Sequence, residues 1–395
     1  MNTREAVVVS GARTPTGNFG GSLSGFTAAE LASFVTSAAI ERSGVKPDAV
    51  EEVIFGAHVQ AGLKSNFARQ AAIAAGIPEE VPAWVPNINC GSGLRAVVSA
   101  AQDIMLGQYD AVIAGGAETM SRAPYLLTKH RFGERMGHGE IYDSLLYDSL
   151  IDPFMNYHMG VTAENVAAKC GITREMQDEF AFASHKKAAA ARDAGKFDAE
   201  IVPIEIKSKK GVTIFDKDES IRDDISLEKL AALKPVFKKD GGTVTAGNAS
   251  PVNDAAAALF LTSAEKAKAL GLKPRLVFRA YTTVGVNPSI MGYGPVPAIN
   301  KLLEKTGLKK EDIDLFEINE AFSAQAAACA KDLALDPAKL NVNGGAVALG
   351  HAVGCSGARL VIVLMNELER RNGRYGIASL CIGGGQGIAA LFERA

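Results

Sequence analysis

Cys90-Gly91-Ser92-Gly93-Leu94-Arg95 and, much later, Gly354-Cys355-Ser356-Gly357-Ala358-Arg359 are the stretches of this 395-residue sequence that best predict its fold. Each is followed by a stretch with helical periodicity, a short turn that contains a tyrosine, a strand-like run and a glycine cluster. Upstream, Glu51–Phe55 and Glu311–Phe316 resemble each other in the same way. A pattern that recurs in the same order indicates an internal duplication. We therefore predict two duplicated halves, with chance similarity between two α/β segments as the alternative.

Short apolar runs rich in β-branched residues alternate with helical patterns along the chain, which is typical of sheets covered by helices. We predict an α/β fold in which both halves have mixed, largely parallel sheets and helices packed in layers. A capping-box pattern, Thr27-Ala28-Ala29-Glu30, marks the start of one helix that ends at Ser43-Gly44. The expected strands are Val7–Val9, Val53–Phe55, Ala83–Ile88, Ala111–Ala114, Ala256–Leu261, Leu276–Ala280, Leu315–Ile318 and Ile377–Ile382.

A segment of different character separates the halves. It contains a charged, turn-rich stretch at 207–224 and a stretch with glycines and histidines at 128–140. Long insertions in compact domains usually serve as lids or binding loops. We predict an N-terminal half formed by residues 1–119 and 248–270, an inserted loop domain at 120–247, and a C-terminal half at 271–395.

Composition excludes several classes of protein. The 42 basic and 44 acidic residues nearly cancel, so no overall field attracts nucleic acid or an anionic membrane. The five cysteines are scattered, without a C-x-x-C pair or a His/Cys cluster at metal spacing, so we expect neither a disulfide framework nor a metal. The N-terminus starts with a strand-like run, and no apolar stretch of 18 residues follows. We predict a cytoplasmic protein with free thiols.

The residue that most resembles a nucleophile is Cys90. It follows a strand-like run and precedes a predicted helix at Leu94–Leu106, where the positive end of the helix is expected to lower the thiol pKa. The alternative is a buried structural cysteine, the more frequent role of a free thiol.

Three further segments favour the catalytic interpretation. Gly344–Gly350 places glycines before His351, Cys381 is followed by the glycine run at 383–385, and Asn319-Glu320-Ala321-Phe322 lies where a strand gives way to a helix. Glycine runs expose N–H groups to anions, and ligands collect at the ends of strands in open α/β sheets. A lone histidine is more often structural, but here it accompanies two cysteines in glycine-rich turns.

On these segments, together with Asn89-Cys90-Gly91-Ser92-Gly93 and Gly247-Asn248-Ala249-Ser250, the chain resembles the thiolase family from end to end, and within it the biosynthetic acetoacetyl-CoA thiolases. The resemblance implies reversible Claisen condensation of two acetyl-CoA molecules to acetoacetyl-CoA and coenzyme A. It implies no cofactor, because coenzyme A thioesters are the substrates. It also implies a homotetramer, a dimer of dimers joined by the polar loop Met120–Gly139.

The resemblance assigns roles by position. Cys90 is the acylated nucleophile and His351 its base, which also helps to bind the thioester oxygen of the second substrate. Asn319 holds a water that completes that oxyanion site, and Cys381 takes the α-proton of the incoming acetyl-CoA. The N–H groups of Cys90 and Gly383 stabilise the oxyanion formed when the acyl-enzyme is attacked. The substrate contacts that it implies are His158, Met159, Met291 and Phe322 around the acyl and pantetheine groups, and Arg222, Phe237 and Ser250 around coenzyme A.

The sequence departs from the family pattern at two places: Ala352 replaces the usual proline after the histidine, and Ser65-Asn66-Phe67 replaces Gln-Asn-Pro. The rival functions are a degradative 3-ketoacyl-CoA thiolase of broader chain length and a non-catalytic acyl-CoA-binding homologue. A decarboxylating ketosynthase is disfavoured, because that relative has a second histidine where Asn319 lies and no counterpart of Cys381. His158-Met159 favours short acyl chains.

Overall fold

The computed structural model describes residues 4–209 and 211–395. Its central feature is one ten-stranded sheet in the order β12-β13-β14-β11-β1-β10-β5-β3-β4, with β2 paired to β10. The strands of this sheet are β1 (Ala6–Arg13), β2 (Gly17–Asn18), β3 (Glu52–Gly56), β4 (Ala83–Trp84), β5 (Ala111–Thr119), β10 (Asn253–Ser263), β11 (Leu276–Gly285), β12 (Leu315–Ile318), β13 (Tyr375–Ile382) and β14 (Gln386–Arg394).

The pairing pattern in this sheet is the same in the two halves. In the N-terminal half β3 and β5 are parallel, β5 is antiparallel to β10, and β10 is antiparallel to β1. In the C-terminal half β12 and β13 are parallel, β13 is antiparallel to β14, and β14 is antiparallel to β11. The halves meet where β1 pairs with β11. The predicted duplication and mixed α/β architecture are therefore confirmed.

Parallel pairing is nevertheless the minority, contrary to the expectation of largely parallel sheets: only β3–β4, β3–β5 and β12–β13 are parallel among the described pairs of the large sheet. A tight turn joins β13 to β14, and such a turn enforces antiparallel pairing. The expected strand at Ala83–Ile88 is also shorter than predicted, because only Ala83–Trp84 pairs. Pro86 lacks the N–H that a longer ladder requires.

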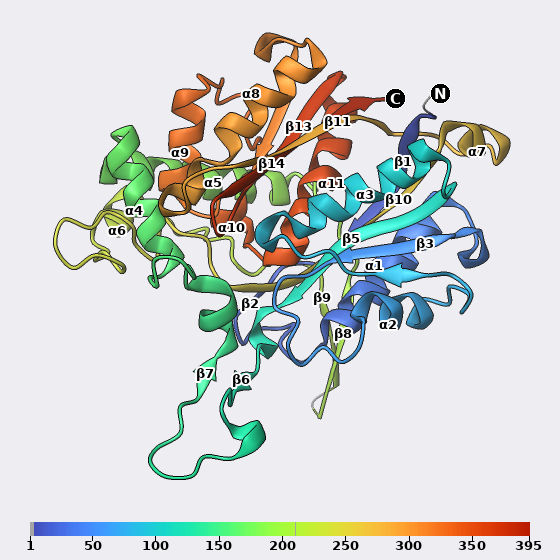
Figure 1. Cartoon of the computed structure of the whole chain (residues 1–395). Helices are drawn as coiled ribbons and strands as arrows, with labels where there is room; N and C mark the ends of the chain where they lie inside the picture. The colour runs from blue at the N-terminus through green and yellow to red at the C-terminus, as the bar shows by residue number, and fades with distance from the viewer. Residues whose placement is uncertain (1–3, 210) are drawn as a thin grey trace.

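Helices form three layers around the sheet halves (Figure 1). One core cluster joins α3 and α11 to the inner faces of both halves. A second packs α1 and α2 against the N-terminal half, and a third packs α8 and α9 against the C-terminal half. The helices are α1 (Ala28–Ser43), α2 (Phe67–Ala74), α3 (Ser92–Leu106), α4 (Met159–Cys170), α5 (Arg174–Asp193), α6 (Leu227–Ala231), α7 (Ala264–Ala269), α8 (Pro295–Thr306), α9 (Ser323–Asp332), α10 (Ala346–Leu349) and α11 (Val353–Arg371).

The predicted caps of α1 are present. Thr27 and Glu30 form the reciprocal capping box, and Gly44 ends the helix in the left-handed region with φ of 79°. Both devices satisfy backbone groups that a helix end leaves without a partner.

Glycines allow α3 and α11 to approach closely at the centre of the molecule. A Cβ on Gly93 would lie 2.6 Å from the carbonyl oxygen of Gly354, and one on Gly357 would lie 2.3 Å from the backbone nitrogen of Leu94. Only residues without a side chain fit at such distances. This contact brings the starts of the two helices together, and both starts lie at the cavity described below.

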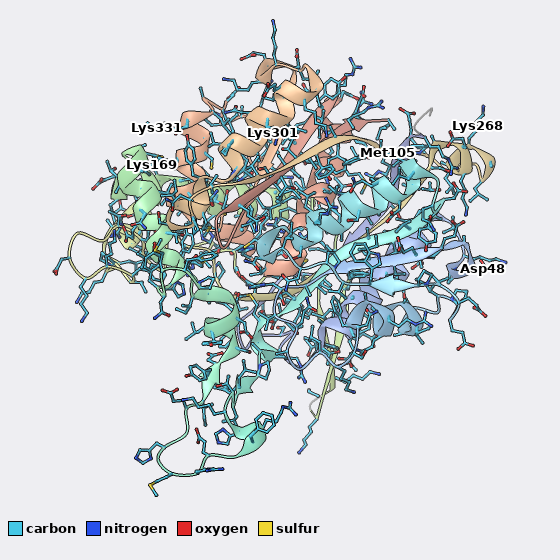
Figure 2. All side chains as sticks on the ribbon, in the orientation of Figure 1. Asp48, Met105, Lys169, Lys268, Lys301 and Lys331 are labelled. Carbon is cyan, nitrogen blue, oxygen red and sulfur yellow. The ribbon has the colours of Figure 1, made fainter. Side chains whose placement is uncertain are left out.

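The segment between β5 and β10 contributes α4, α5, α6 and two small hairpins, β6 (Tyr125–Leu126) with β7 (Tyr142–Asp143) and β8 (Ile204–Ser208) with β9 (Gly211–Phe215). The β6–β7 hairpin extends into an arm that stands clear of the rest of the molecule (Figure 1 and Figure 2). Within the described residues, no helix is long and apolar enough to cross a membrane.

Candidate active site

Cys90 lies in a single 3-10 turn, Asn89–Gly91, that leads directly into α3. Asn89 has a positive φ of 52°, and its side-chain amide donates to the carbonyl oxygen of Gly383 at 2.9 Å. The Ser92 hydroxyl donates to the Asn89 carbonyl at 2.7 Å and accepts from the Ile88 N–H at 2.9 Å. These bonds hold the thiol at the surface of a cavity, where Cys90 is partly exposed.

The expected lowering of the Cys90 pKa by the start of α3 is not found in the ligand-free chain. Burial raises the pKa of this thiol to about 11. The N–H groups of Gly383 and of Cys90 itself act in the opposite direction, and the negative charge of Glu118 adds to the increase. Desolvation of the thiolate therefore outweighs the helix N-terminus. The same two N–H groups face the sulfur, as the predicted oxyanion site requires.

His351 is held in a defined tautomer. Its backbone N–H donates to Asn253 Oδ1 at 2.9 Å, and its Nδ1 lies 2.7 Å from the Ser356 hydroxyl oxygen. Because the Ser356 hydroxyl donates to the Ala352 carbonyl at 2.9 Å, its oxygen is left to accept a proton from Nδ1. Nε2 is then the unprotonated nitrogen. Burial, followed by the charges of Arg359 and His58, lowers the pKa of His351 to about 3, so the resting imidazole is neutral and able to act as a base.

Asn319 follows β12 and faces the same nitrogen. Its Nδ2 lies 3.4 Å from His351 Nε2, while its Oδ1 is buried without a hydrogen-bond partner. A buried amide oxygen without a partner is a costly feature that a water or a ligand would satisfy. This geometry suits the role in water binding that the sequence predicts for Asn319.

Cys381 lies near the end of β13 and is completely buried, unlike Cys90. Burial raises its pKa well above the usual value, and the nearby Cys90 adds to this increase. Cys381 packs in an apolar cluster that includes Met159, Met291 and Phe322. It is not among the residues that line the cavity, whereas these three side chains are.

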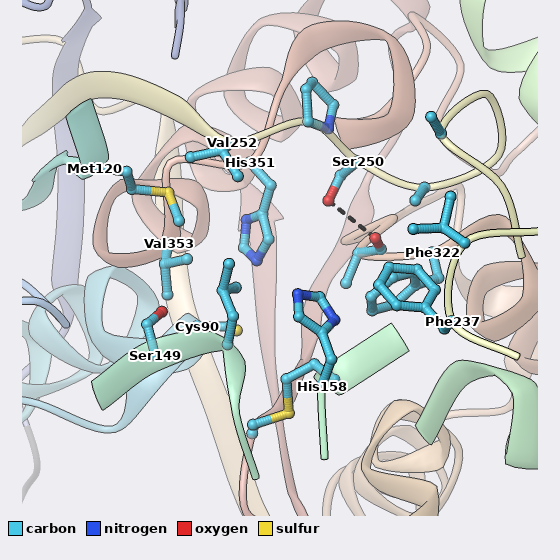
Figure 3. A pocket seen from close by; sticks show the side chains of 18 of the residues that line it. Cys90, Met120, Ser149, His158, Phe237, Ser250, Val252, Phe322, His351 and Val353 are labelled. Atoms are coloured by element: carbon cyan, nitrogen blue, oxygen red, sulfur yellow. Dashed lines mark hydrogen bonds between the residues drawn. The ribbon is translucent and has the colours of Figure 1, made fainter. Parts of the chain in front are cut away.

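One cavity of about 490 Å³ collects the predicted site residues. It is lined by Cys90, His351 and Gly383 and by all seven predicted substrate contacts, namely His158, Met159, Arg222, Phe237, Ser250, Met291 and Phe322. Figure 3 shows Cys90, His351 and His158 around this space, with the hydrogen bond from Ser250 drawn as a dashed line. Asn319 and Cys381 stand behind the lining.

His158 caps α4 and forms part of the cavity wall. Its Nδ1 accepts from the Gly160 N–H at 3.0 Å, so its Nε2 carries the proton when the ring is neutral. The ring stacks on Phe237 with centroids 4.6 Å apart, and Phe237 meets Phe322 edge to face at 6.2 Å. Gly160 permits this arrangement, since a Cβ there would lie 2.2 Å from the Phe237 ring. The result is an aromatic wall with one N–H donor.

Several residues of the site were missed from the sequence. His58, Met120, Ser149 and Val353 line the cavity beside Cys90, and Ser356 and Asn253 hold His351. Only Ser356 gave a usable signal, because it belongs to the duplicated Ser-Gly pattern and lies one helical turn beyond the histidine. Of the others, Val353 begins α11, Asn253 begins β10, and His58, Met120 and Ser149 lie in connecting segments, so the approach of these residues to the site depends on tertiary structure.

No group of three or more His, Cys, Asp or Glu residues within 4–209 and 211–395 is arranged to hold a metal ion. The cavity lining combines the Cys90 thiol and the neutral His351 imidazole with two backbone N–H groups that face the sulfur. Such a set can carry out nucleophilic acyl transfer.

A duplicated α/β fold that places a cysteine thiol and a neutral imidazole on one cavity at the joined helix starts suits an acyltransferase that uses a cysteine. Residues 6–265 match the family model for the thiolase N-terminal domain, and residues 272–394 match that for the thiolase C-terminal domain. The chain therefore belongs to the thiolase family.

Similar proteins cover the whole chain. An acetyl-CoA acetyltransferase of Cupriavidus necator is 52% identical over 391 residues, which is 99% of both chains. The crystal structure of the Bacillus anthracis acetyl-CoA acetyltransferase superimposes with a TM-score of 0.97 at 49% identity, and that of human mitochondrial 3-ketoacyl-CoA thiolase with 0.96 at 44%. Both structures cover 100% of this chain and are themselves covered completely.

Proposed function

We propose that this chain is an acetyl-CoA C-acetyltransferase, which joins two acetyl-CoA molecules into acetoacetyl-CoA and free coenzyme A and also runs the reaction in reverse. The observation that carries the proposal is the position of the Cys90 thiol and the unprotonated Nε2 of His351 on one cavity, with the Cys90 and Gly383 N–H groups facing the sulfur. Relatives that bear this activity in their names match the whole chain.

In the first half-reaction, the Cys90 sulfur attacks the thioester carbonyl of acetyl-CoA while His351 Nε2 takes the thiol proton. The tetrahedral intermediate then expels the coenzyme A sulfur, which leaves with that proton. A neutral thiol and a neutral imidazole suit this sequence, because in a buried site the ion pair is costly before the substrate arrives. The product is acetyl-Cys90.

In the second half-reaction, the Cys381 thiol first passes its proton to Nε2 of His351, and the resulting thiolate takes a proton from the α-carbon of another acetyl-CoA. The enolate oxygen then accepts hydrogen bonds from the protonated Nε2 of His351 and from the water assigned to Asn319. The carbanion attacks the acetyl-Cys90 carbonyl, and the N–H groups of Cys90 and Gly383 stabilise the oxyanion. Collapse of that intermediate releases acetoacetyl-CoA and returns the Cys90 thiolate, which recovers its proton from Nε2 of His351. Each such donor can contribute about 3–4 kcal/mol in a preorganised site.

Short acyl chains are the proposed substrates. Met159, Met291 and Phe322 close the wall beside Cys90, and the stacked His158 and Phe237 narrow it further. The test is thiolysis of 3-ketoacyl-CoA substrates of increasing length with free coenzyme A, measured as kcat/KM. We expect the highest value for acetoacetyl-CoA. A maximum at long chains would establish the degradative alternative, and binding without turnover would establish the acyl-CoA-binding alternative.

The assembly that we propose is a homotetramer formed through the β6–β7 arms, in a cytoplasmic enzyme that uses coenzyme A thioesters as substrates and needs no cofactor. The arm carries basic and acidic side chains, and it also exposes large apolar ones: Phe132 is 96% exposed, Met136 98% and Ile141 66%. Its contact surface is therefore less polar than the sequence indicated. Exposed apolar side chains on a protruding segment are typical of interfaces. Light scattering should give a tetramer for the full chain and a dimer after deletion of residues 128–140; a monomeric full chain would refute the proposal.

A further inference from the structure

Glu118, at the end of β5, is a buried carboxylate to which the reaction steps above assign no role. It is 1% exposed. Its two oxygens accept three backbone N–H groups: His58 at 2.9 Å, Val59 at 3.1 Å and Gly354 at 2.8 Å. The first two belong to the segment after β3, and the third belongs to the first turn of α11. One side chain therefore joins the two halves of the molecule at the edge of the cavity.

A continuous path of hydrogen bonds leads from this carboxylate to the nucleophile. The His58 N–H is bound by Glu118, and the His58 carbonyl accepts from Asn87 Nδ2 at 3.1 Å. Asn87 Oδ1 in turn accepts from the Asn89 N–H at 3.0 Å, and Asn89 directly precedes Cys90. On its other side, Glu118 fixes Gly354, three residues after His351.

We propose that Glu118 is a positioning residue for acyl transfer: its carboxylate sets the placement of the His351 turn relative to the Cys90 turn. The proposal rests on the acetyl-transfer function above. Without this carboxylate, three buried N–H groups lose their acceptor, and the path between nucleophile and base is broken at its centre.

The charge of Glu118 also acts on the thiols around it. The titratable groups that interact with its charge are Asp254 from β10, Cys90 at the start of α3 and Cys355 on α11, whereas His58 from the segment after β3 contacts it through the backbone N–H. Burial raises the pKa of Glu118 to about 7, while its three N–H donors oppose the increase and Asp254 adds to it. Its negative charge disfavours the Cys90 thiolate. Loss of the Glu118 charge should therefore increase the reactivity of the Cys90 thiol, whereas loss of the Glu118 hydrogen-bond geometry should decrease the rate of acetyl transfer to it.

This opposition gives a test with two variants and two readouts on purified full-length protein. One readout is the single-turnover rate of acetyl transfer from radiolabelled acetyl-CoA to Cys90. The other is the rate of Cys90 alkylation by iodoacetamide at pH 8, which follows the thiolate fraction. Glu118→Gln removes the charge at nearly constant length, whereas Glu118→Asp keeps the charge but shortens the reach.

We expect acetyl transfer to fall about 10-fold or more in both variants, since positioning errors reduce rates steeply. Alkylation should become about 3-fold faster or more in Glu118→Gln and stay within about 2-fold in Glu118→Asp. The control is Glu52→Gln. Glu52 is another buried carboxyl, and its pKa is raised to about 7, mainly by burial, but it accepts a hydrogen bond from Trp84 at the sheet edge. Acetyl transfer and alkylation should both be unchanged in this variant.

A third variant tests the path without touching the carboxylate. Asn87→Ala removes an exposed side chain, so the protein is expected to fold, and acetyl transfer should fall. Combined with Glu118→Asp, the losses should be less than additive, because both changes break one path. Additive losses, or acetyl transfer within about 2-fold of wild type in Glu118→Asp and Asn87→Ala, overturn the proposal. Absence of acetyl transfer in the wild-type protein would instead refute the proposed function, and the same assay reports it.

Discussion

The first turns of α3 and α11 share one sequence pattern, yet one presents a thiol to the cavity and the other is closed by a carboxylate. Cys90 matches Gly354 in the duplicated stretches. The N–H groups around Cys90 and Gly383 are turned toward the thiol, whereas the Gly354 N–H is bound by Glu118. The free N–H donors of a helix N-terminus can bind a reacting group or a fixed side chain. In the N-terminal half they face the Cys90 thiol, and in the C-terminal half they bind Glu118.

The matching serines show the same divergence. Among the described residues, the Ser92 hydroxyl forms hydrogen bonds only with the backbone of its own turn, at Ile88 and Asn89. Ser356 bonds back to the Ala352 carbonyl in a similar manner, but its oxygen also meets His351 Nδ1. The serine hydroxyl that stabilises the start of α3 in one half therefore has a counterpart that also orients His351 in the other half.

The largest expected effect concerns the thiols of Cys90 and Cys381. Cys90→Ala should abolish acetyl uptake, because no acyl-enzyme can form. Cys381→Ala should still take up one acetyl group, since that half-reaction needs only Cys90, His351 and the oxyanion donors. Its condensation rate should fall by about 10²–10⁴-fold, the usual contribution of a general base.

The measurement is radiolabelled acetyl incorporation alongside condensation kinetics. Retained labelling in Cys90→Ala would exclude that residue as the nucleophile. Normal condensation in Cys381→Ala or Cys381→Ser would show that Cys381 is only a packed structural thiol.

The pH dependence of alkylation is the next largest effect and distinguishes Cys90 from Cys355, its neighbour on α11. Their pKa values are raised to about 11 and about 12, chiefly by burial. Below its pKa, the thiolate fraction of Cys90 grows about 10-fold per pH unit, so iodoacetamide labelling should rise about 100-fold from pH 7 to pH 9. Cys355 is only 2% exposed and should stay unlabelled. Peptide mass analysis with and without acetyl-CoA, which should protect Cys90, checks both statements; a plateau near pH 7 would contradict the raised pKa.

The duplication explains how much of this molecule could be predicted from its sequence. Repeated patterns and strand-like runs predicted the mixed α/β architecture, because local spacing determines it. Glycine-flanked Cys90, His351 and Cys381 marked the candidate site, and the roles predicted for them came from the family resemblance. The sequence could not reveal that burial would raise the Cys90 pKa against the helix N-terminus, since desolvation depends on what covers the turn. It also gave no sign of Glu118, whose three partners come from distant segments.

A smaller effect is expected from the two matched serines. Ser356→Ala removes the acceptor that holds the Nδ1 proton of His351, so the ring can adopt the wrong tautomer. Acetyl transfer should fall about 10-fold, which corresponds to one hydrogen bond of about 1.4 kcal/mol. Ser92→Ala is the matched comparison: it removes bonds within the Cys90 turn and none to His351, so it should lower the unfolding temperature and reduce acetyl transfer per folded enzyme less than Ser356→Ala does. Equal rate losses in both variants would mean that Ser356 has no more than the structural role of Ser92.

The smallest expected effect is that of proline at Ala352, which precedes Gly354 by two positions, as Ile88 precedes Cys90. Ala352 has φ of −73°, which proline adopts without strain, whereas Ile88 has φ of −132°. Ala352→Pro should therefore stabilise the protein by about 0.4–1 kcal/mol, because it restricts the unfolded chain at no cost in the folded one. Turnover should change by less than about 2-fold. Ile88→Pro is the matched opposite: it requires a different φ and removes the N–H that bonds Ser92, so it should destabilise by about 3 kcal/mol or more. Thermal and denaturant unfolding of the two variants measures both changes. His351 pairs with Val252 in a parallel bridge. If Ala352→Pro were destabilised, this bridge would need the Ala352 N–H, and the two helix starts would be equally intolerant of proline.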